Sequence, residues 1–426
     1  MSSVKNRIVR SLFIFCSLSY SQGYMNAIGL GKLYSNQGSK NAMDGLSLLS
    51  PTVSKNVNFS NPSTWHNLKF TYLSLSYSVN HTSLENKSLT NAYSDLSNAL
   101  WIIPIKSKLS VGFSVSPYIN QKVNIASLDT ISYTAFDDTL NISRSFKRSG
   151  GLLFLKVGSS YQLTQKSSIG ILTKVIFGSS RQSESAKLMG SEIVKTSRNR
   201  YNGLISEFYL SLKFGEYSSF HSSFITTLKP IETAQLDKHL FDDANSNGFH
   251  DWSSPYFDFP FPDSVKSNSE YRISDVHNPN GIQVGVSRIV NEKFSLSVEY
   301  SYIEDAAEEL NKIYLPLNKW ISNTNSFAFL ISRFASNSSL NLIDKISFRS
   351  GLKYSKHALN KDEKSIQEFG YSMGVGFKFK QVSNQIDFNY CFGIREYPFE
   401  FNKEIFHQLQ VSVSLADIWF IKRRQR

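Results

Sequence analysis

Strict alternation of apolar and polar residues is the strongest pattern in the chain. In the C-terminal stretch "HQLQVSVSLADIWF", Leu409, Val411, Val413 and Leu415 alternate with polar residues. The stretches "LSVGFSVSPYI", "FSLSVEYSYI" and "QIDFNYCF" repeat the pattern. A period of two predicts a β-strand with one apolar and one polar face. In a soluble sandwich the apolar face points to the core, whereas in an outer-membrane barrel it points to lipid.

Fourteen segments of the chain carry this alternation between turn signals. Several are longer than an ordinary strand of ~5–6 residues, and ~9–11 residues are enough to cross a bilayer as a strand. The predicted strands are 67–82, 94–105, 107–131, 138–163, 166–183, 193–215, 217–234, 270–290, 293–304, 323–339, 343–357, 366–381, 383–395 and 404–420.

The connections between these segments alternate in length. The short ones are "PIKS", "LTQKSS", "FGEYS", "IVNEK", "NLIDK" and "KQVSN", and the longer ones are 83–93, 132–137, 184–192, 235–269, 305–322, 358–365 and 396–403. An up-and-down barrel has this arrangement, with short periplasmic turns and long extracellular loops. We therefore predict an all-β protein: a transmembrane antiparallel up-and-down β-barrel of about 14 strands over 67–420. It would lie in the outer membrane, with both termini periplasmic.

The regions outside the barrel carry different signals. Residues 1–21 have a basic start, the apolar core "SLFIFCSLS" and small residues before Gln22, which together predict a secretory signal peptide. Residues 22–66 are rich in Gly, Ser and Asn, so they form either a disordered leader or a plug folded into the lumen. Residues 421–426 are a basic periplasmic tail. Once the signal is removed only Cys391 remains, so no intrachain disulfide is expected.

Composition and charge exclude some classes of protein and of partner. A mean hydropathy of −0.25 is too polar for a bundle of membrane helices. The net charge is +12 and falls to 12 − 3 = +9 after removal of residues 1–21. The basic residues are spread along the chain without interleaved aromatics, so no nucleic-acid partner is expected. The expected surroundings are outer-membrane lipid.

Several phrases resemble the FadL-type outer-membrane transporters, in particular their divergent relatives in Bacteroidota-like bacteria. They are "NFSNPSTW", "ALWIIPIKSKLSVGFSVSPY", "RSGGLLFLKVGSSYQLTQKSSIGILTKVIFG" and "LADIWFIKRR", and the resemblance spans about 25–420. It implies a 14-stranded barrel with an N-terminal hatch at 22–66 and with Asn61 and Pro62 at the junction between hatch and barrel.

The resemblance also implies a function. The family moves hydrophobic small molecules, such as fatty acids, by passive diffusion across the outer membrane. Another branch consists of non-transporting barrels that act as partners in protein secretion or cell-envelope assembly, and this alternative stays open. A general aqueous pore is a further alternative, against which the hatch argues.

The loop 235–269 contains a candidate calcium site. Asp243, Asn245, Asn247 and Asp251 fall at positions 1, 3, 5 and 9 of a calcium loop, with Gly248 at position 6. Position 12 is Ser254, so the usual bidentate Glu is missing and weak affinity is expected. The alternative is a polar turn in which Asn-Gly suits the backbone. No other cofactor is expected.

The same loop continues with the aromatic residues Tyr256, Phe257, Phe259 and Phe261. They could form a groove for a hydrophobic ligand, cap the barrel mouth, or pack on neighbouring loops. Residues 304–320 predict a short amphipathic helix, as a lid or as loop filler.

Catalysis is not predicted. The chain has no Gly-x-Ser-x-Gly elbow and no His-Glu-x-x-His motif. Asp275 and His277 share one strand face and form the best candidate dyad, but isolated histidines at strand ends are usually interfacial. We therefore expect a protein that is not an enzyme.

Overall fold

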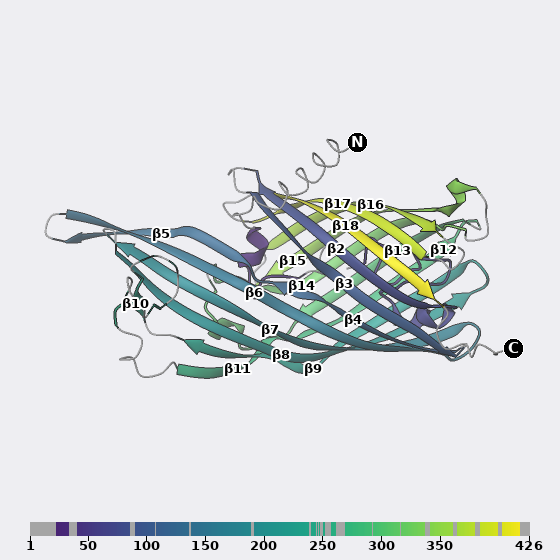
Figure 1. Cartoon of the computed structure of the whole chain (residues 1–426), viewed down its shortest axis with the longest axis horizontal. Helices are drawn as coiled ribbons and strands as arrows, with labels where there is room; N and C mark the ends of the chain where they lie inside the picture. Colours follow the sequence, from purple (N-terminus) through teal and green to yellow (C-terminus); the bar gives the residue numbers. More distant parts are fainter. Residues whose placement is uncertain are drawn as a thin grey trace, which may run out of the picture.

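In the computed structural model the chain forms a long barrel whose strands run obliquely around it (Figure 1). The structure describes residues 23–33, 41–85, 90–106, 108–135, 138–188, 191–237, 240–243, 245, 247, 250–251, 257–260, 269–291, 293–315, 317–336, 341–360, 364–379, 384–398 and 403–417. The predicted signal peptide at 1–21 and the basic tail at 421–426 lie outside the described residues.

Fourteen strands close into one antiparallel barrel, as predicted, and β18 pairs with β2 to complete the ring. The barrel strands are β2 (Thr71–Leu84), β3 (Thr90–Lys106), β4 (Leu109–Asn120), β6 (Asp138–Gln162), β7 (Ser167–Leu188), β8 (Ser191–Phe214), β9 (Ser218–Asp237), β12 (Pro279–Ile289), β13 (Phe294–Asp305), β14 (Ile321–Arg333), β15 (Ile346–Leu359), β16 (Ser365–Phe379), β17 (Asn384–Glu396) and β18 (Lys403–Asp417).

Two of the predicted strands are each interrupted once. The predicted strand 107–131 is divided into β4 and β5 (Val123–Ala135), and both pair with β6. The predicted strand 270–290 is divided into β11 (Ser269–His277) and β12, and both pair with β9. At each break a side chain takes the place of a ladder partner: Asn120 accepts the Lys122 N–H at 3.0 Å, and Asp305 accepts the Asn278 N–H at 2.7 Å.

The apolar faces of the strands point out of the barrel. On β18, Leu409, Val413 and Leu415 are 45%, 39% and 48% exposed, whereas Gln408, Gln410, Ser412 and Ser414 are buried. All fourteen barrel strands carry at least one exposed large apolar residue. The molecule therefore has an apolar outer surface and a polar lumen, the reverse of a soluble sandwich. None of the helices in the described part of the chain is long and apolar enough to cross a membrane.

One side of the barrel continues far beyond the rest, as Figure 1 shows at the end marked by β5 and β10. There β5, β6, β7, β8, β9 and β11 form what we call the projecting sheet, and β10 (Phe241–Asp242) pairs with β8 near its tip. β6 has 25 residues, about 85 Å at ~3.4 Å per residue. The sequence predicted loops at 132–137 and 184–192, but most of these residues continue the strands.

The lumen is filled by the chain that precedes β2. Residues 23–33 and 41–67, which we call the lumenal segment, are mostly buried and include η1 (Tyr24–Ala27), β1 (Lys32–Leu33) and η3 (Pro62–Asn67). The ring of Trp65 lies so close to the wall that a Cβ at Gly112 would collide with it. A glycine in the strand is therefore needed where the lumenal segment rests on the wall.

The loop between β13 and β14 contains one short helical turn instead of the amphipathic helix predicted at 304–320. Among the described residues of this loop only η4 (Leu310–Lys312) is helical, and Pro316 in the sequence cannot continue a helix from this turn because it lacks the N–H. Leu310, Ile313 and Leu315 are buried against the lumenal side of the wall.

Candidate functional site in the lumen

The candidate site is the contact between the lumenal segment and the barrel wall. The helical turn η3 is held by three strands: Ser110 of β4 donates to the Trp65 carbonyl at 3.1 Å, the His66 N–H donates to Ser160 of β6 at 3.2 Å, and Ser63 hydrogen-bonds Ser211 of β8 at 2.6 Å. Serine on the polar face of each strand makes this possible. The turn η3 is thus attached at the end of the barrel where β18 ends (Figure 1).

Glu299 on β13 is the first charged anchor of the lumenal segment. Its carboxylate accepts the backbone N–H groups of Leu48, Leu49 and Ser50 at 2.9, 3.2 and 2.8 Å and the Ser47 hydroxyl at 2.7 Å. The Glu299 side chain is buried. Four donors directed at one carboxylate form a charge-assisted anchor, which is stronger than a set of neutral hydrogen bonds.

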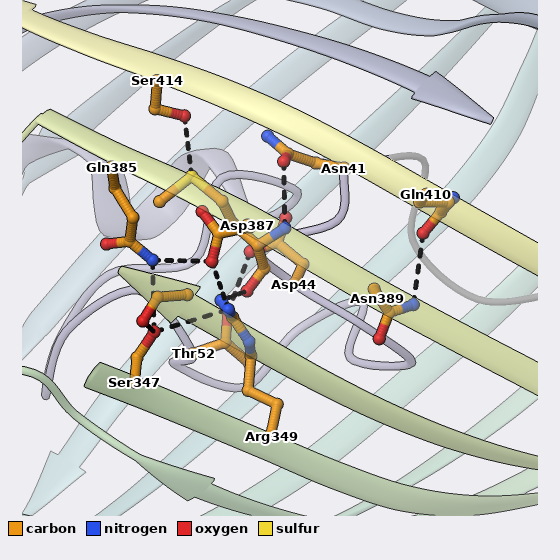
Figure 2. A network of polar contacts seen from close by, with 12 residues as sticks. Asn41, Asp44, Thr52, Ser347, Arg349, Gln385, Asp387, Asn389, Gln410 and Ser414 are labelled. Carbon is orange, nitrogen blue, oxygen red and sulfur yellow. Dashed lines mark hydrogen bonds and ion pairs between the residues drawn. The ribbon is translucent and has the colours of Figure 1, made fainter. Parts of the chain in front are cut away.

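Arg349 on β15 is the second anchor, and Figure 2 shows its surroundings. It donates to the Met43 carbonyl of the lumenal segment and to the Asp387 carboxylate on β17. Gln385 donates to the same carboxylate at 2.6 Å. Within the segment, Asp44 accepts from Thr52 at 2.9 Å. Arg349 and Asp387 thereby join two wall strands and the lumenal segment in one buried network.

Arg395 on β17 is the centre of a third buried group. It forms ion pairs with Glu368 of β16 and, at 3.0 Å, with Glu404 of β18, and all three side chains are almost fully buried. Tyr397 donates to Glu404 at 2.6 Å. The same carboxylate accepts the Tyr24 N–H of the lumenal segment at 3.1 Å. The start of the segment is thus fixed to three adjacent wall strands.

A mainly apolar cavity of about 180 Å³ lies between the lumenal segment and the wall formed by β3, β4, β6–β9 and β11–β14. Its apolar lining includes Ile28, Leu30, Phe154, Leu172, Ile205 and Ile225. Charged groups enter it at several places: Lys174 pairs with Glu207, Lys156 lies over the Phe154 ring at 4.6 Å, and Asp44 and Asp305 also belong to the lining. A mainly apolar cavity with a few convergent polar groups is the usual form of a small-molecule site.

A chain of three polar side chains borders this cavity. His277 Nδ1 lies 2.5 Å from Asp305 Oδ2, and His277 Nε2 lies 2.8 Å from the Tyr118 hydroxyl. The sequence suggested Asp275 as the partner of His277, whereas the structure pairs this histidine with Asp305. The break at Asn278 brings the end of β11 beside the end of β13, and alternation along one strand could not reveal that contact.

The loop between β13 and β14 is attached to the projecting sheet through Glu309. Its carboxylate accepts the Ser274 N–H and hydroxyl at 2.8 and 2.9 Å. Hydrogen bonds from Lys312 and then from Ser274 lower the pKa of Glu309 to about 2. The Glu309 carboxylate therefore stays ionised throughout the physiological pH range.

Asn61 and Pro62, predicted at the junction, lie at the start of η3. Asn61 is fully buried, its side chain accepts the Ser63 N–H at 3.1 Å and donates to the Leu49 carbonyl at 2.9 Å, and Pro62 occupies the first helical position. This arrangement caps the turn. It also connects η3 to the residues held by Glu299, so Asn61 belongs to the lumenal site.

Two of the four predicted aromatic residues lie in the part of the chain that the structure describes. Phe257 and Phe259 are 53% and 69% exposed and do not line the cavity. Phe259 forms an isolated bridge with Asp242 of β10. Tyr256 and Phe261 lie outside the described residues. A ligand groove formed by all four residues stays a prediction.

The predicted calcium residues are neighbours in the structure. Asn245 and Asn247 donate their amide groups to Asp251 at 2.8 and 2.6 Å, and the Asn247 N–H donates to Asp243 at 3.1 Å. In the part of the chain that the structure describes, no group of three His, Cys, Asp or Glu could hold a metal. To bind calcium, the side-chain amides of Asn245 and Asn247 would have to turn their oxygens toward the ion.

Calcium binding to this loop is directly measurable. We expect calorimetry on the purified protein to show calcium binding with a Kd of about 10⁻⁴–10⁻³ M, the range of weak extracellular sites. The double variant Asp243→Asn, Asp251→Asn should lose it, because it removes both carboxylates from the motif. Asp242→Asn, an exposed neighbour, should bind as the natural protein does. Identical heats for all three proteins would support the polar turn.

Comparisons with known proteins agree on the architecture. The family model described as BamG matches residues 3–425. Among solved structures, the CymD monoaromatic hydrocarbon channel aligns with a TM-score of 0.54 at 9% identity, covering 94% of this chain and 100% of its own. A FadL homologue from Pseudomonas aeruginosa aligns with a TM-score of 0.53 at 11% identity, covering 93% and 99%.

The toluene transporter TbuX of Ralstonia pickettii aligns with a TM-score of 0.52 at 10% identity, covering 90% of this chain and 99% of its own. The three structures are described as channels, transporters or their homologues, and none as an enzyme. At these identities the likeness establishes the FadL-type fold. No curated protein matches the sequence.

Proposed function

Since the chain belongs to the BamG family and has the barrel fold of hydrocarbon channels, we propose that it binds a hydrophobic small molecule in the lumenal cavity and lets it pass by passive diffusion. The observation that carries this proposal is the cavity of about 180 Å³ with its mainly apolar lining. Its volume suits a compact ligand, because a dry apolar cavity of ~150 Å³ in another protein binds benzene. The lumenal segment would act as the hatch.

The cavity can be filled from the lumenal segment without changing the wall. Leu30→Trp adds a large ring to the lining of the cavity, whereas Leu46→Trp makes the same change in the same segment outside that lining. We expect mass spectrometry of gently purified natural protein to detect a released hydrophobic compound. The Leu30→Trp variant should retain at least tenfold less of this compound than the natural protein, and the Leu46→Trp variant should retain as much as the natural protein.

Two results would contradict this function. One is a natural protein that carries no hydrophobic compound and binds none of a series of alkanes, fatty acids and monoaromatic compounds. The other is equal retention by both tryptophan variants. In each case, heat-dependent mobility on a gel must first show that the barrels are folded.

Both candidate functions require the barrel to lie in an outer membrane, with the projecting sheet outside and the Asp417 end of β18 on the periplasmic side. The apolar outer surface supports this location. We expect Leu409→Arg to lower the free energy of unfolding from lipid vesicles by about 2–4 kcal/mol, since it would put a charge in the middle of the apolar band. Ile405→Arg, nearer the strand end, should cost about 0–1 kcal/mol. If both substitutions lowered the free energy of unfolding by the same small amount, burial of Leu409 in lipid would be contradicted.

The second candidate function is a barrel that docks other envelope or secretion proteins and passes nothing. It is favoured by the projecting sheet, in which β5 pairs only with β6 and β11 only with β9 among the described residues. Open sheet edges are templates for a strand of another protein. Tight co-purification of a protein that is lost when the tip of the projecting sheet is shortened would support this candidate.

A further inference from the structure

A second cavity lies between the projecting sheet and the loop that joins β13 to β14, and we call it the outer cleft. Its volume is about 480 Å³, within the range of roughly 300–1,000 Å³ that small-molecule pockets usually have. The residues that line it are different from those of the lumenal cavity. Loop residues 311–315 and 318 lie on one side, and the inner face of the sheet forms the floor with Gln182, Glu184, Lys195, Ser197, Gln235 and Tyr271.

Two glutamines of the floor have amide oxygens without a hydrogen-bond partner among the described residues. Gln182 of β7 and Gln235 of β9 are only 3% and 4% exposed. Asn199 of β8, directly opposite Gln235, and Thr233 of β9 also carry buried polar atoms that lack a partner in the described chain. Buried polar atoms are normally paired. Four such residues on three neighbouring strands indicate that their partners come from molecules that enter the cleft.

Asp237 determines which end of the Gln235 amide stays available. Its carboxylate accepts the amide nitrogen of Gln235 at 2.8 Å and the Tyr271 hydroxyl at 3.2 Å. Because the carboxylate can only accept, the amide nitrogen must face it, and the amide oxygen is left to accept from another group. The floor of the outer cleft therefore offers acceptors that suit a hydroxyl group.

The charged residues that line the outer cleft have neighbours of opposite charge. Lys195 Nζ lies 3.9 Å from Asp237 Oδ2, and Glu184 lies directly opposite Lys195 in the sheet. Lys312 of the loop pairs with Glu309. A buried charge on a ligand is costly unless the site supplies a partner for it. A cleft whose charges are already paired is therefore suited to a neutral ligand.

Two tyrosines give the outer cleft an apolar side. Tyr271 in the floor is 39% exposed, and Tyr314 in the loop opposite is half-buried beside the buried Ile313 and Leu315. Tyrosine combines an apolar ring with a polar tip. A saccharide has the matching form, because its hydroxyl groups lie around the edge of the ring and its C–H groups lie on the faces.

We propose that the outer cleft binds a neutral saccharide. Sugar hydroxyls donate to the amide oxygens of Gln182 and Gln235, and a C–H face of the sugar packs against Tyr271. The last torsion of a glutamine side chain is soft, so the oxygens can turn to the ligand without a shift of the strands. A molecule without hydroxyl groups leaves these buried oxygens unpaired, which disfavours its binding. Free oligosaccharides and glycans of the cell surface share this chemistry.

The test is calorimetric titration of the whole protein in a detergent without a sugar headgroup. The ligands are neutral trisaccharides of glucose, galactose, mannose and N-acetylglucosamine, and neutral glycans released from the surface of the source cells. Trigalacturonate is the acidic counterpart of the galactose trisaccharide. Heat-dependent mobility on a gel first shows that each variant is folded.

Two pairs of variants test the cleft from its two sides. Gln182→Met, Gln235→Met removes both amides of the floor and keeps the length of the side chains. Its control is Gln408→Met, Gln410→Met, which changes two buried glutamines of β18 outside the cleft. Asn311→Trp places a ring in the cleft from an exposed loop position, and Glu308→Trp makes the same change at an exposed position outside the lining.

We expect at least one neutral saccharide to bind the natural protein and both controls equally. The floor variant and Asn311→Trp should bind it at least tenfold more weakly. Tightest binding of the released glycans would identify the cell surface as the source of the ligand, and tightest binding of a trisaccharide would identify a free saccharide.

Three results would overturn the proposal. The first is the absence of binding by every saccharide, which would leave the outer cleft to water. The second is tighter binding of trigalacturonate than of the galactose trisaccharide. The third is equal binding by Asn311→Trp and Glu308→Trp, a comparison at exposed positions that holds even if the floor variant does not fold.

Discussion

Replacement of Arg395 by methionine should leave most of the protein unable to reach the folded barrel. Arg395 is fully buried between Glu368 and Glu404. Its removal leaves two buried carboxylates close together without the cation that pairs with both, and breaking a buried pair in this way costs ~3–5 kcal/mol. The measurement is the fraction of refolded protein that shows heat-dependent gel mobility, followed by urea unfolding of whatever folds.

The control for Arg395→Met is a variant in which all three buried charges are neutralised together. The triple variant Arg395→Met, Glu368→Gln, Glu404→Gln removes the cation together with both carboxylates and should recover much of the folded form. Lys403→Met removes a partner of the exposed pair with Glu396, which is 3.8 Å long, and such pairs contribute only ~0–1 kcal/mol. If Arg395→Met unfolds at the same urea concentration as Lys403→Met, the buried network does not stabilise the barrel.

Removal of two wall anchors should convert a closed barrel into an ion-conducting one. In the double variant Glu299→Ala, Arg349→Met, the residues from Ser47 to Ser50 lose one carboxylate acceptor, and the Met43 carbonyl loses its guanidinium donor. Each buried group left without a partner costs ~1–3 kcal/mol. The lumenal segment should then leave its place for part of the time. Single-channel recording in planar bilayers should show at least a tenfold increase in open time.

The conductance of the double variant is compared with that of the natural protein and of a control variant. The natural barrel should be closed, and steady conductance from it would favour the general aqueous pore. Glu396→Ala, Lys403→Met changes one acidic and one basic residue in an exposed pair and should stay closed. A folded double variant Glu299→Ala, Arg349→Met that stays closed would show that η3 and the segment before it are held by other contacts.

The sequence predicted the wall of this protein better than its interior. Period-two alternation depends only on neighbouring residues, so it located all fourteen strands and identified the outward face of Leu409, Val413 and Leu415. It also assigned Glu299 and Asp387 to the polar face. It could not identify their partners, because the Ser47 contact with Glu299 joins residues 252 apart. Such pairings follow from barrel closure.

Segments of irregular backbone could not be predicted from the sequence either. The lumenal segment has little periodicity, so its residues allowed either a leader or a plug, and only the folded structure shows that Asn61 and Trp65 are buried against the wall. The pairing of His277 with Asp305 was missed for a related reason. It depends on a break at Asn278, where a side-chain hydrogen bond replaces the regular ladder.

The contact between the lumenal segment and the closing strands bears on how the molecule is assembled. Ser414 of β18 hydrogen-bonds Ser74 of β2 at 2.9 Å and Met43 Sδ at 2.8 Å, and Asn41 donates to Ser74 at 3.3 Å. The seam between the first and last strands therefore includes the lumenal segment, so docking of this segment stabilises the closed ring itself and not only the plugged lumen.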